Sequence, residues 1–144
     1  MTFPVSVPRL KVQHIIDWLE PQLQSGVDIM PGKVPTGEPN RIIGIMTAAG
    51  RILEMDGLIE PRGYTFQCRG GADNYGDAED IAYELDSILL AAPTDFDIAE
   101  SVTIESIVRN GGAPSAATIA DSQSRWVFQC TYIFRTPLTL YTMG

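Results

Sequence analysis

The chain has 144 residues, 44% of them hydrophobic, which is enough for one domain with a single core. Its 18 acidic residues against 10 basic ones give a formal charge of −8. This charge argues against a nucleic-acid binder that neutralises phosphates, although it is compatible with a surface past which DNA slides without binding. The opening residues MTFPVSVPRL lack the apolar centre of a signal peptide, and no apolar run approaches a membrane span, so we expect synthesis in a cytoplasm.

Residues 7–24 are predicted to form the first helix. Its apolar stripe consists of Val12, Ile15, Ile16, Leu19 and Leu23. Ser6 is expected to cap this helix and Pro8 to fit its first turn, whereas Pro21 should end or kink it. His14, the only histidine, is off the centre of the stripe, so we predict a solvated or interface residue rather than a catalytic one.

The next part of the chain is predicted to contain loops and strands. Residues 25–40 hold three prolines and three glycines and are typical of a loop, with a short strand at 27–30. Residues 41–47 read as a buried strand. Residues 64–69 alternate, with Tyr64, Phe66 and Cys68 on one face. We predict that residues 48–63 form a long hairpin connection that is partly mobile in the free subunit.

A strand, a glycine-rich turn and a helix follow one another at residues 66–90, the order found in phosphate-binding loops. The helix start, however, is crowded with acidic residues, namely Asp73, Asp77, Glu79 and Asp80. Carboxylates there satisfy the helix dipole and repel a phosphate. We therefore predict that Gly70 and Gly71 only turn the chain and that Asn74 or Asp77 caps the helix.

The second helix is predicted over residues 77–90, and residues 95–100 are expected to form a solvated acidic loop. The helix stripe comprises Ala78, Ile81, Ala82, Leu85, Ile88 and Leu89. Residues 101–109 and 125–135 read as strands. The second of these places five side chains on one face: Trp126, Phe128, Cys130, Tyr132 and Phe134. Cys68 and Cys130 are predicted as small buried residues rather than zinc ligands or a disulfide.

Together these elements predict an α+β fold: a mainly antiparallel sheet of about four or more strands with two helices packed on one face. We predict a single domain over residues 1–144, with a C-terminal arm at 136–144 that has no obvious partner within the chain. The single histidine, two cysteines and scattered acids form no recognised catalytic, cofactor or metal site. The sequence therefore predicts a protein that is not an enzyme and needs no cofactor.

Two short patterns carry a resemblance to a known family. After a strand and a Gly-rich turn, the second helix contains Ala78, Glu79, Ala82, Tyr83 and Leu85. Further on, Gly112, Pro114, Asp121 and Arg125 precede the long aromatic strand. Over roughly residues 10–135 the chain resembles the tail terminator (tail completion, or minor capsid) proteins of long-tailed bacteriophages. Their helix pattern is A-E-x-x-A-Y-x-I/L, and a Gly-x-Pro, an Asp and an Arg come before their last strand.

The resemblance implies a structural virion protein that forms a ring, usually of six copies. Such a ring caps the tail tube, ends its polymerisation and joins it to the head connector, and DNA passes through its lumen without specific binding. The implied partners are further copies of the chain, a tail tube protein and a head–tail connector protein. The implied location is the tail or neck of the virion, after synthesis in the host cytoplasm, with no membrane.

Within such a ring we predict two groups of surface residues. Candidate subunit-interface residues are arginines at strand ends and apolar residues of the arm: Arg69, Arg109, Arg125, Arg135, Leu138, Leu140 and Tyr141. These arginines would pair with acids of the neighbour, unless they are simply solvated strand ends. Candidate lumen-facing or tube-facing residues are Glu54, Asp56 and Glu60.

Two alternatives stay open. Another neck or connector component, or a tail-tube protein, would fit the same pattern, and a tube protein would polymerise alone into long tubes. A small cytosolic α+β enzyme or ligand-binding domain is the alternative of a different class. It would need a concave polar site.

Overall fold

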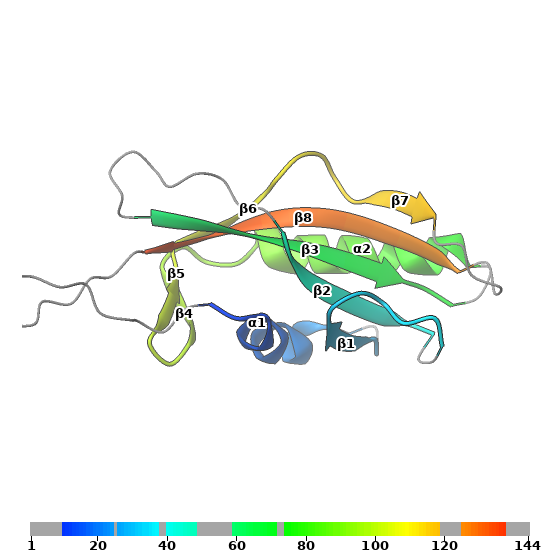
Figure 1. Cartoon of the computed structure of the whole chain (residues 1–144), viewed down its shortest axis with the longest axis horizontal. Coiled ribbons are helices and arrows are strands. Elements are labelled where there is room, and N and C mark those ends of the chain that lie inside the picture. Colours follow the sequence, from blue (N-terminus) through cyan, green and yellow to red (C-terminus); the bar gives the residue numbers. More distant parts are fainter. Residues whose placement is uncertain are drawn as a thin grey trace, which may run out of the picture.

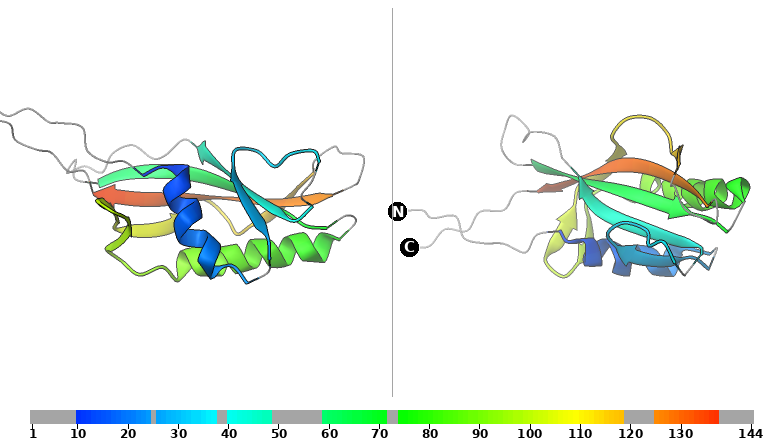
Figure 2. Two further views of the ribbon diagram at one scale, coloured as in Figure 1. Left: turned by 90° about the horizontal axis from the view of Figure 1, so that it is seen from below. Right: turned by 45° about the vertical axis from the view of Figure 1, so that its right-hand side comes forward.

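A twisted sheet with two helices on one of its faces makes up the described part of the chain in the computed structural model, which covers residues 10–24, 26–37, 40–48, 59–71, 74–118 and 125–137 (Figures 1 and 2). In chain order the elements are α1 (Val12–Leu19), the 3-10 turn η1 (Glu20–Gln22), β1 (Asp28–Pro31), β2 (Ile42–Ala48), β3 (Ile59–Arg69), α2 (Tyr75–Leu90), β4 (Phe96–Ala99), β5 (Val102–Ile104), β6 (Ser106–Arg109), β7 (Ser115–Thr118) and β8 (Trp126–Pro137).

The main sheet has six strands in the order β1-β2-β3-β8-β6, and β7 pairs with the other half of β8. All pairs are antiparallel except β1 with β2, which are parallel. The long strands β3 and β8 form the centre, with Tyr64 opposite Tyr132. Strands β4 and β5 form a separate two-stranded sheet. The predicted α+β class, with a mainly antiparallel sheet, is confirmed.

The core lies between the helices and the inner face of the sheet. Tyr64, Phe66 and Cys68 of β3 point into it, as the alternation predicted. Their aromatic rings meet those of β8 edge to face, with Phe66 and Tyr132 centroids 5.5 Å apart. Both predicted stripes pack against this layer, although Val12, Leu23 and Ile88 are only half-buried. In the left view of Figure 2, α1 crosses in front of the strands and α2 runs below them, roughly along their length.

The boundaries of the first helix differ from the prediction. α1 begins at Val12 rather than at residue 7, and the backbone N–H of Lys11, the N-cap, donates to Nδ1 of half-buried His14 at 3.0 Å. Ser6 and Pro8 lie outside the described residues. The α-helix ends at Leu19 and continues as a single 3-10 turn that contains Pro21, so the prediction that this proline ends the helix is confirmed.

Four predictions about loops, strands and the arm are corrected. Residues 136 and 137 of the predicted C-terminal arm belong to β8 and pair with β3. Residues 59–63 belong to β3, because they pair with β8 as far as Ile59 opposite Pro137. Residues 49–58 of the predicted connection lie outside the described residues. The predicted strand 101–109 is two strands in different sheets, and residues 96–99 form a hairpin strand instead of a loop. The chain passes from the small sheet to the main sheet at Glu105. The N–H of Glu105 donates to the Arg135 carbonyl of β8, and its carbonyl oxygen accepts from the N–H of Asp95.

Candidate functional site

Two of the four interface arginines are buried inside their own subunit. Arg69 and Arg125 are only 1% and 2% exposed. Both guanidinium groups donate to the carbonyl oxygen of Gly37 at 2.9 Å, and Arg125 also donates to Oδ1 of Asn40 at 3.2 Å. This burial corrects the expectation that they pair with acids of a neighbour. The two arginines hold the proline-rich loop, through Pro35, Thr36, Gly37 and Asn40, over one end of the outer face of the sheet.

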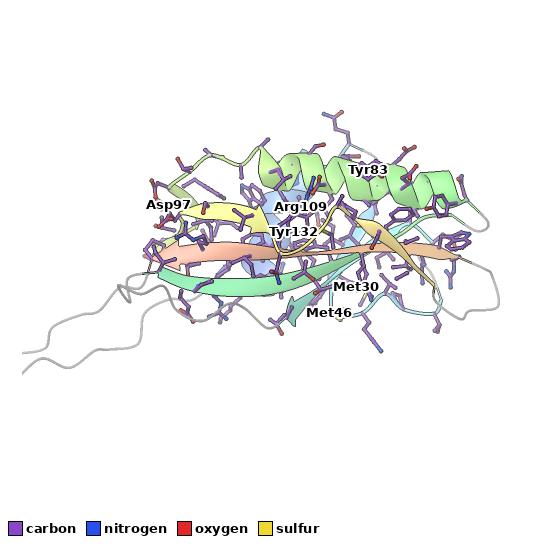
Figure 3. The ribbon with its side chains drawn as sticks, turned by 90° about the horizontal axis from the view of Figure 1, so that it is seen from above. Met30, Met46, Tyr83, Asp97, Arg109 and Tyr132 are labelled. Atoms are coloured by element: carbon purple, nitrogen blue, oxygen red, sulfur yellow. The ribbon has the colours of Figure 1, made fainter. Side chains whose placement is uncertain are left out.

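Arg109 of β6 and Tyr132 of β8 are opposite each other in the sheet (Figure 3), and both bond to Asp86 of α2. The Nε and second guanidinium nitrogen of Arg109 donate to the two carboxylate oxygens of Asp86 at 2.8 and 2.7 Å. The hydroxyl of buried Tyr132 donates to the same carboxylate at 2.6 Å. The hydrogen bond from Arg109, helped by that from Tyr132, lowers the pKa of Asp86 against the opposing effect of burial. Burial and the adjacent carboxylate raise the pKa of Tyr132, so its proton stays in place.

Sequence reasoning named Arg109 as a subunit-interface arginine and Tyr132 as a strand-face residue, and it missed Asp86, which joins them. The sequence did contain a signal for Asp86: it is an acidic residue that directly follows Leu85, at the margin of the predicted buried stripe. The bidentate geometry and the fully engaged carboxylate are typical of a structural ion pair that joins a helix to an edge strand. The cluster therefore positions β6 against α2 rather than activating a proton or a nucleophile.

The remaining predicted site residues are partly placed. Arg135 pairs with Glu105 of its own chain at 2.6 Å, and both side chains are about 30% exposed. Glu60 lies within β3 rather than in a loop, 3.4 Å from Arg62. Glu54 and Asp56, together with Leu138, Leu140 and Tyr141, lie outside the described residues.

The glycine corner is closed to anions by its own side chains. The Asp77 carboxylate accepts from the Gly71 N–H at 2.8 Å and forms an ion pair with Arg41 at 3.0 Å. Burial alone would raise the pKa of Asp77, but the hydrogen bonds from Arg41 and Gly71 outweigh it and lower the pKa. Asn74 caps the helix by accepting from the N–H of Asp77 at 3.0 Å, as predicted.

Basic and acidic side chains are used differently in the described part of the chain. Its six arginines all bond to groups of their own subunit: Arg41, Arg62, Arg69, Arg109, Arg125 and Arg135. Helix α2 carries five acidic residues and no basic one. Of these acids, Asp80 is exposed and has no ion pair within the described residues. Helix α2 itself is therefore an acidic segment, with Asp80 as its exposed acid.

Sites suited to a small ligand are poorly developed in this part of the molecule. The hollow bordered by Cys68, Cys130 and Tyr132 has no room for a water molecule. A surface hollow of about 220 Å³ is lined by β2 and β3, and its Arg62 and Glu60 pair with each other. Among the described residues, no three His, Cys, Asp or Glu side chains are grouped to hold a metal ion.

Neither helix of the described chain is both long and apolar enough to cross a membrane. No protein-family model matches the chain, and no curated protein matches it.

Proposed function

We propose that this chain is a structural virion protein. It forms a ring that caps the tail tube of a long-tailed phage, ends tube polymerisation and joins the tube to the head connector, with DNA passing through the lumen. The observation that carries the proposal is the division of charge: the described arginines are bound within the subunit, while α2 carries five acidic residues and no basic one and exposes Asp80 to solvent.

This division suits a passage for DNA. Double-stranded DNA carries about one negative charge per 1.7 Å of axis, so a surface with free arginines would retain it. A negative lumen repels the phosphate backbone over roughly a Debye length, about 8 Å at physiological salt. DNA would then slide through the ring without specific binding.

The buried polar groups also favour a structural role. Asp86, Arg109 and Tyr132 form a saturated cluster, and Asp77 is engaged by Arg41 and Gly71. Groups bonded in this way stabilise one arrangement of helix and sheet, as a subunit of a rigid ring requires. The resemblance implies six copies, which is the ring size we propose.

Ring assembly must overcome the repulsion between subunits of charge −8. Such repulsion between exposed charges weakens with salt, because the Debye length falls from about 10 Å at 0.1 M to about 3 Å at 1 M. Contacts that are not purely electrostatic must therefore hold the ring together, and assembly should improve as salt is raised.

The first experiment is the mass of the purified chain in solution across concentration, followed by negative-stain imaging. Discrete closed rings, and never long tubes, are expected for a protein that ends polymerisation. Added to polymerising tail tube protein, the chain should shorten the tubes. Long tubes of the chain alone would instead identify a tail-tube protein. A monomer at every concentration that leaves tube length unchanged would refute the proposal.

A further inference from the structure

The most exposed large apolar side chains of the described residues gather on one side of the molecule. They are Tyr75, Tyr83, Leu90 and Trp126, between 37% and 46% exposed. Three of them lie on α2 at spacings of 8 and 7 residues, which places them within about 80° of one another around the helix. Trp126 joins them from β8, because its ring centroid is 5.2 Å from that of Tyr75.

This side of α2 faces an open edge of the sheet. Asp86, on the same flank of the helix, bonds to Arg109 of β6. Strands β6 and β7 pair with β8 on one side, and no further described strand lies beyond them. Figure 3 views the molecule from this side, with Tyr83 of α2 beside Arg109. We call the α2 flank together with β6 and β7 the edge surface.

The opposite edge of the sheet is less suited to receive another strand. It is formed by β1, which has four residues and ends in Pro31. Proline has no backbone N–H to donate and is one of the devices that blunt edge strands. Neither β6 nor β7 contains a proline. Of these two outer edges of the main sheet, the edge surface is therefore the one that combines apolar contact area with proline-free edge strands.

We propose that the edge surface receives the C-terminal segment 138–144 of a second copy of the chain. This inference rests on the proposed ring and names the contact that joins its subunits. The segment LTLYTMG follows β8 directly and contains Leu138, Leu140, Tyr141 and Met143, with no charged side chain. An extended peptide of this kind adds to an open sheet edge through backbone hydrogen bonds and fills neighbouring apolar positions.

Charge favours this segment over the body of another subunit. The edge surface includes Glu79 on α2, with exposed Asp80 beside it. A whole copy carries −8, so its surface would be repelled, whereas an uncharged segment is not. The segment's own contact therefore adds no charge repulsion to the repulsion that already acts between two copies of the chain.

Length favours a neighbouring copy over the same chain. Seven extended residues span at most about 25 Å, which matches the roughly 22 Å from Leu90 to Tyr75 along α2. β8 ends at Pro137, eleven residues from Trp126. To run back along its own edge, the segment would need a turn of two to four residues. The remaining five or fewer reach at most about 17 Å, which is short of Tyr75 and Trp126.

Such a contact is heterologous, because the segment of one copy meets a different surface of the next. Heterologous contacts close into rings when the rotation between subunits permits. The arrangement therefore predicts that each subunit needs an intact segment and an intact edge surface.

The test uses full-length double variants. The surface variant is Tyr83→Ser with Leu90→Ser, and the segment variant is Leu138→Ser with Leu140→Ser. The control is Gln13→Ser with Gln22→Ser, which is neutral and equally exposed on the α1 side. Circular dichroism melts, measured at a concentration where the wild type is monomeric, should match wild type for all three variants. The reason is that the two pairs on the described surface are exposed in the subunit, and the segment is proposed to act in another copy.

Oligomeric mass is then measured across concentration. We expect the surface and segment variants to need at least about tenfold higher concentration to assemble, as for loss of central interface anchors. The control should assemble as wild type. An equimolar mixture of the surface and segment variants retains one productive contact per pair. It should therefore give a dimer of twice the 15.7 kDa chain mass and no ring.

Three outcomes would overturn the inference. Wild-type rings with unchanged assembly of either variant would refute this contact while leaving the proposed function intact. Equal loss of assembly in the control would show that the effect is not specific to the edge surface. A mixture that stays monomeric would show that the segment does not bind another copy. A wild-type chain that forms no ring under any condition would instead refute the ring itself.

Discussion

Replacing Asp86 by asparagine removes the charge on which the contact between α2 and β6 depends. The carboxylate is 9% exposed and accepts from Arg109 at 2.7 and 2.8 Å and from Tyr132 at 2.6 Å. A hydrogen bond to a charged group contributes about 1.5–3 kcal/mol. The Arg109 side chain is 34% exposed, so water can replace part of its bond to Asp86 in the variant. The contribution of the Arg109 bonds to the free energy of unfolding is therefore taken at less than the full value. We expect Asp86→Asn to lower the free energy of unfolding by about 2–3 kcal/mol and the Tm by roughly 4–12 °C.

A double-mutant cycle with Tyr132→Phe tests the mechanism. In the wild type this change removes a bond to a carboxylate, about 1.5–3 kcal/mol, whereas in the Asp86→Asn background it removes a bond to a neutral amide, about 0.5–1.5 kcal/mol. Urea denaturation of the four proteins should therefore give a coupling energy of about 1 kcal/mol. Additive effects, or a loss below about 1 kcal/mol for Asp86→Asn alone, would refute the reasoning.

The same variant predicts a change in the pH dependence of stability. Hydrogen bonds from Arg109 and Tyr132 hold the folded pKa of Asp86 below its usual value. A depressed folded pKa adds stability that is present above the unfolded pKa, about 4, and is lost as pH falls through the folded pKa. The difference between wild type and Asp86→Asn should therefore be largest near neutral pH and shrink as the pH falls below about 5 and then through the depressed folded pKa. A difference that does not change with pH would contradict this assignment.

Three further predictions concern the packing of Gly70, the proline-rich loop held by Arg125, and assembly. Gly70→Ala should cost about 1–3 kcal/mol in urea denaturation, because its Cβ would lie 2.5 Å from the backbone nitrogen of Ala78, whereas Gly71→Ala meets nothing nearer than 3.7 Å and should cost less. Arg125→Met should speed amide exchange at Thr36 and Gly37 at least about tenfold, since it removes hydrogen bonds to this loop, and unchanged exchange would show that the arginine does not hold it. Raising sodium chloride from about 0.05 to about 0.5 M should lower the concentration at which rings form in light scattering, because it screens subunit repulsion; the opposite trend would mean that ion pairs drive assembly.

Local periodicity predicted much of the fold. The apolar stripes of both helices and the alternating faces of β3 and β8 follow from 3.6-residue and two-residue repeats in the chain. Acidic residues at the start of α2 likewise predicted that the glycine corner does not bind an anion. In each case the determining contacts lie within a few residues, so they can be seen in the sequence alone.

Only the tertiary structure decided the roles of the charged residues. Arg69 and Arg125 at strand ends look alike in sequence whether they meet solvent, a neighbour or their own chain, and the loop that buries them is 29 to 89 residues away. Asp86 becomes the centre of a cluster because folding brings Arg109 and Tyr132 to it from two strands. The division of residues 101–109 between two sheets depends in the same way on the pairing partners. Pairing between residues far apart in the chain leaves no periodic pattern in the local sequence. A charged residue becomes either solvated or buried and bonded only once the chain has folded.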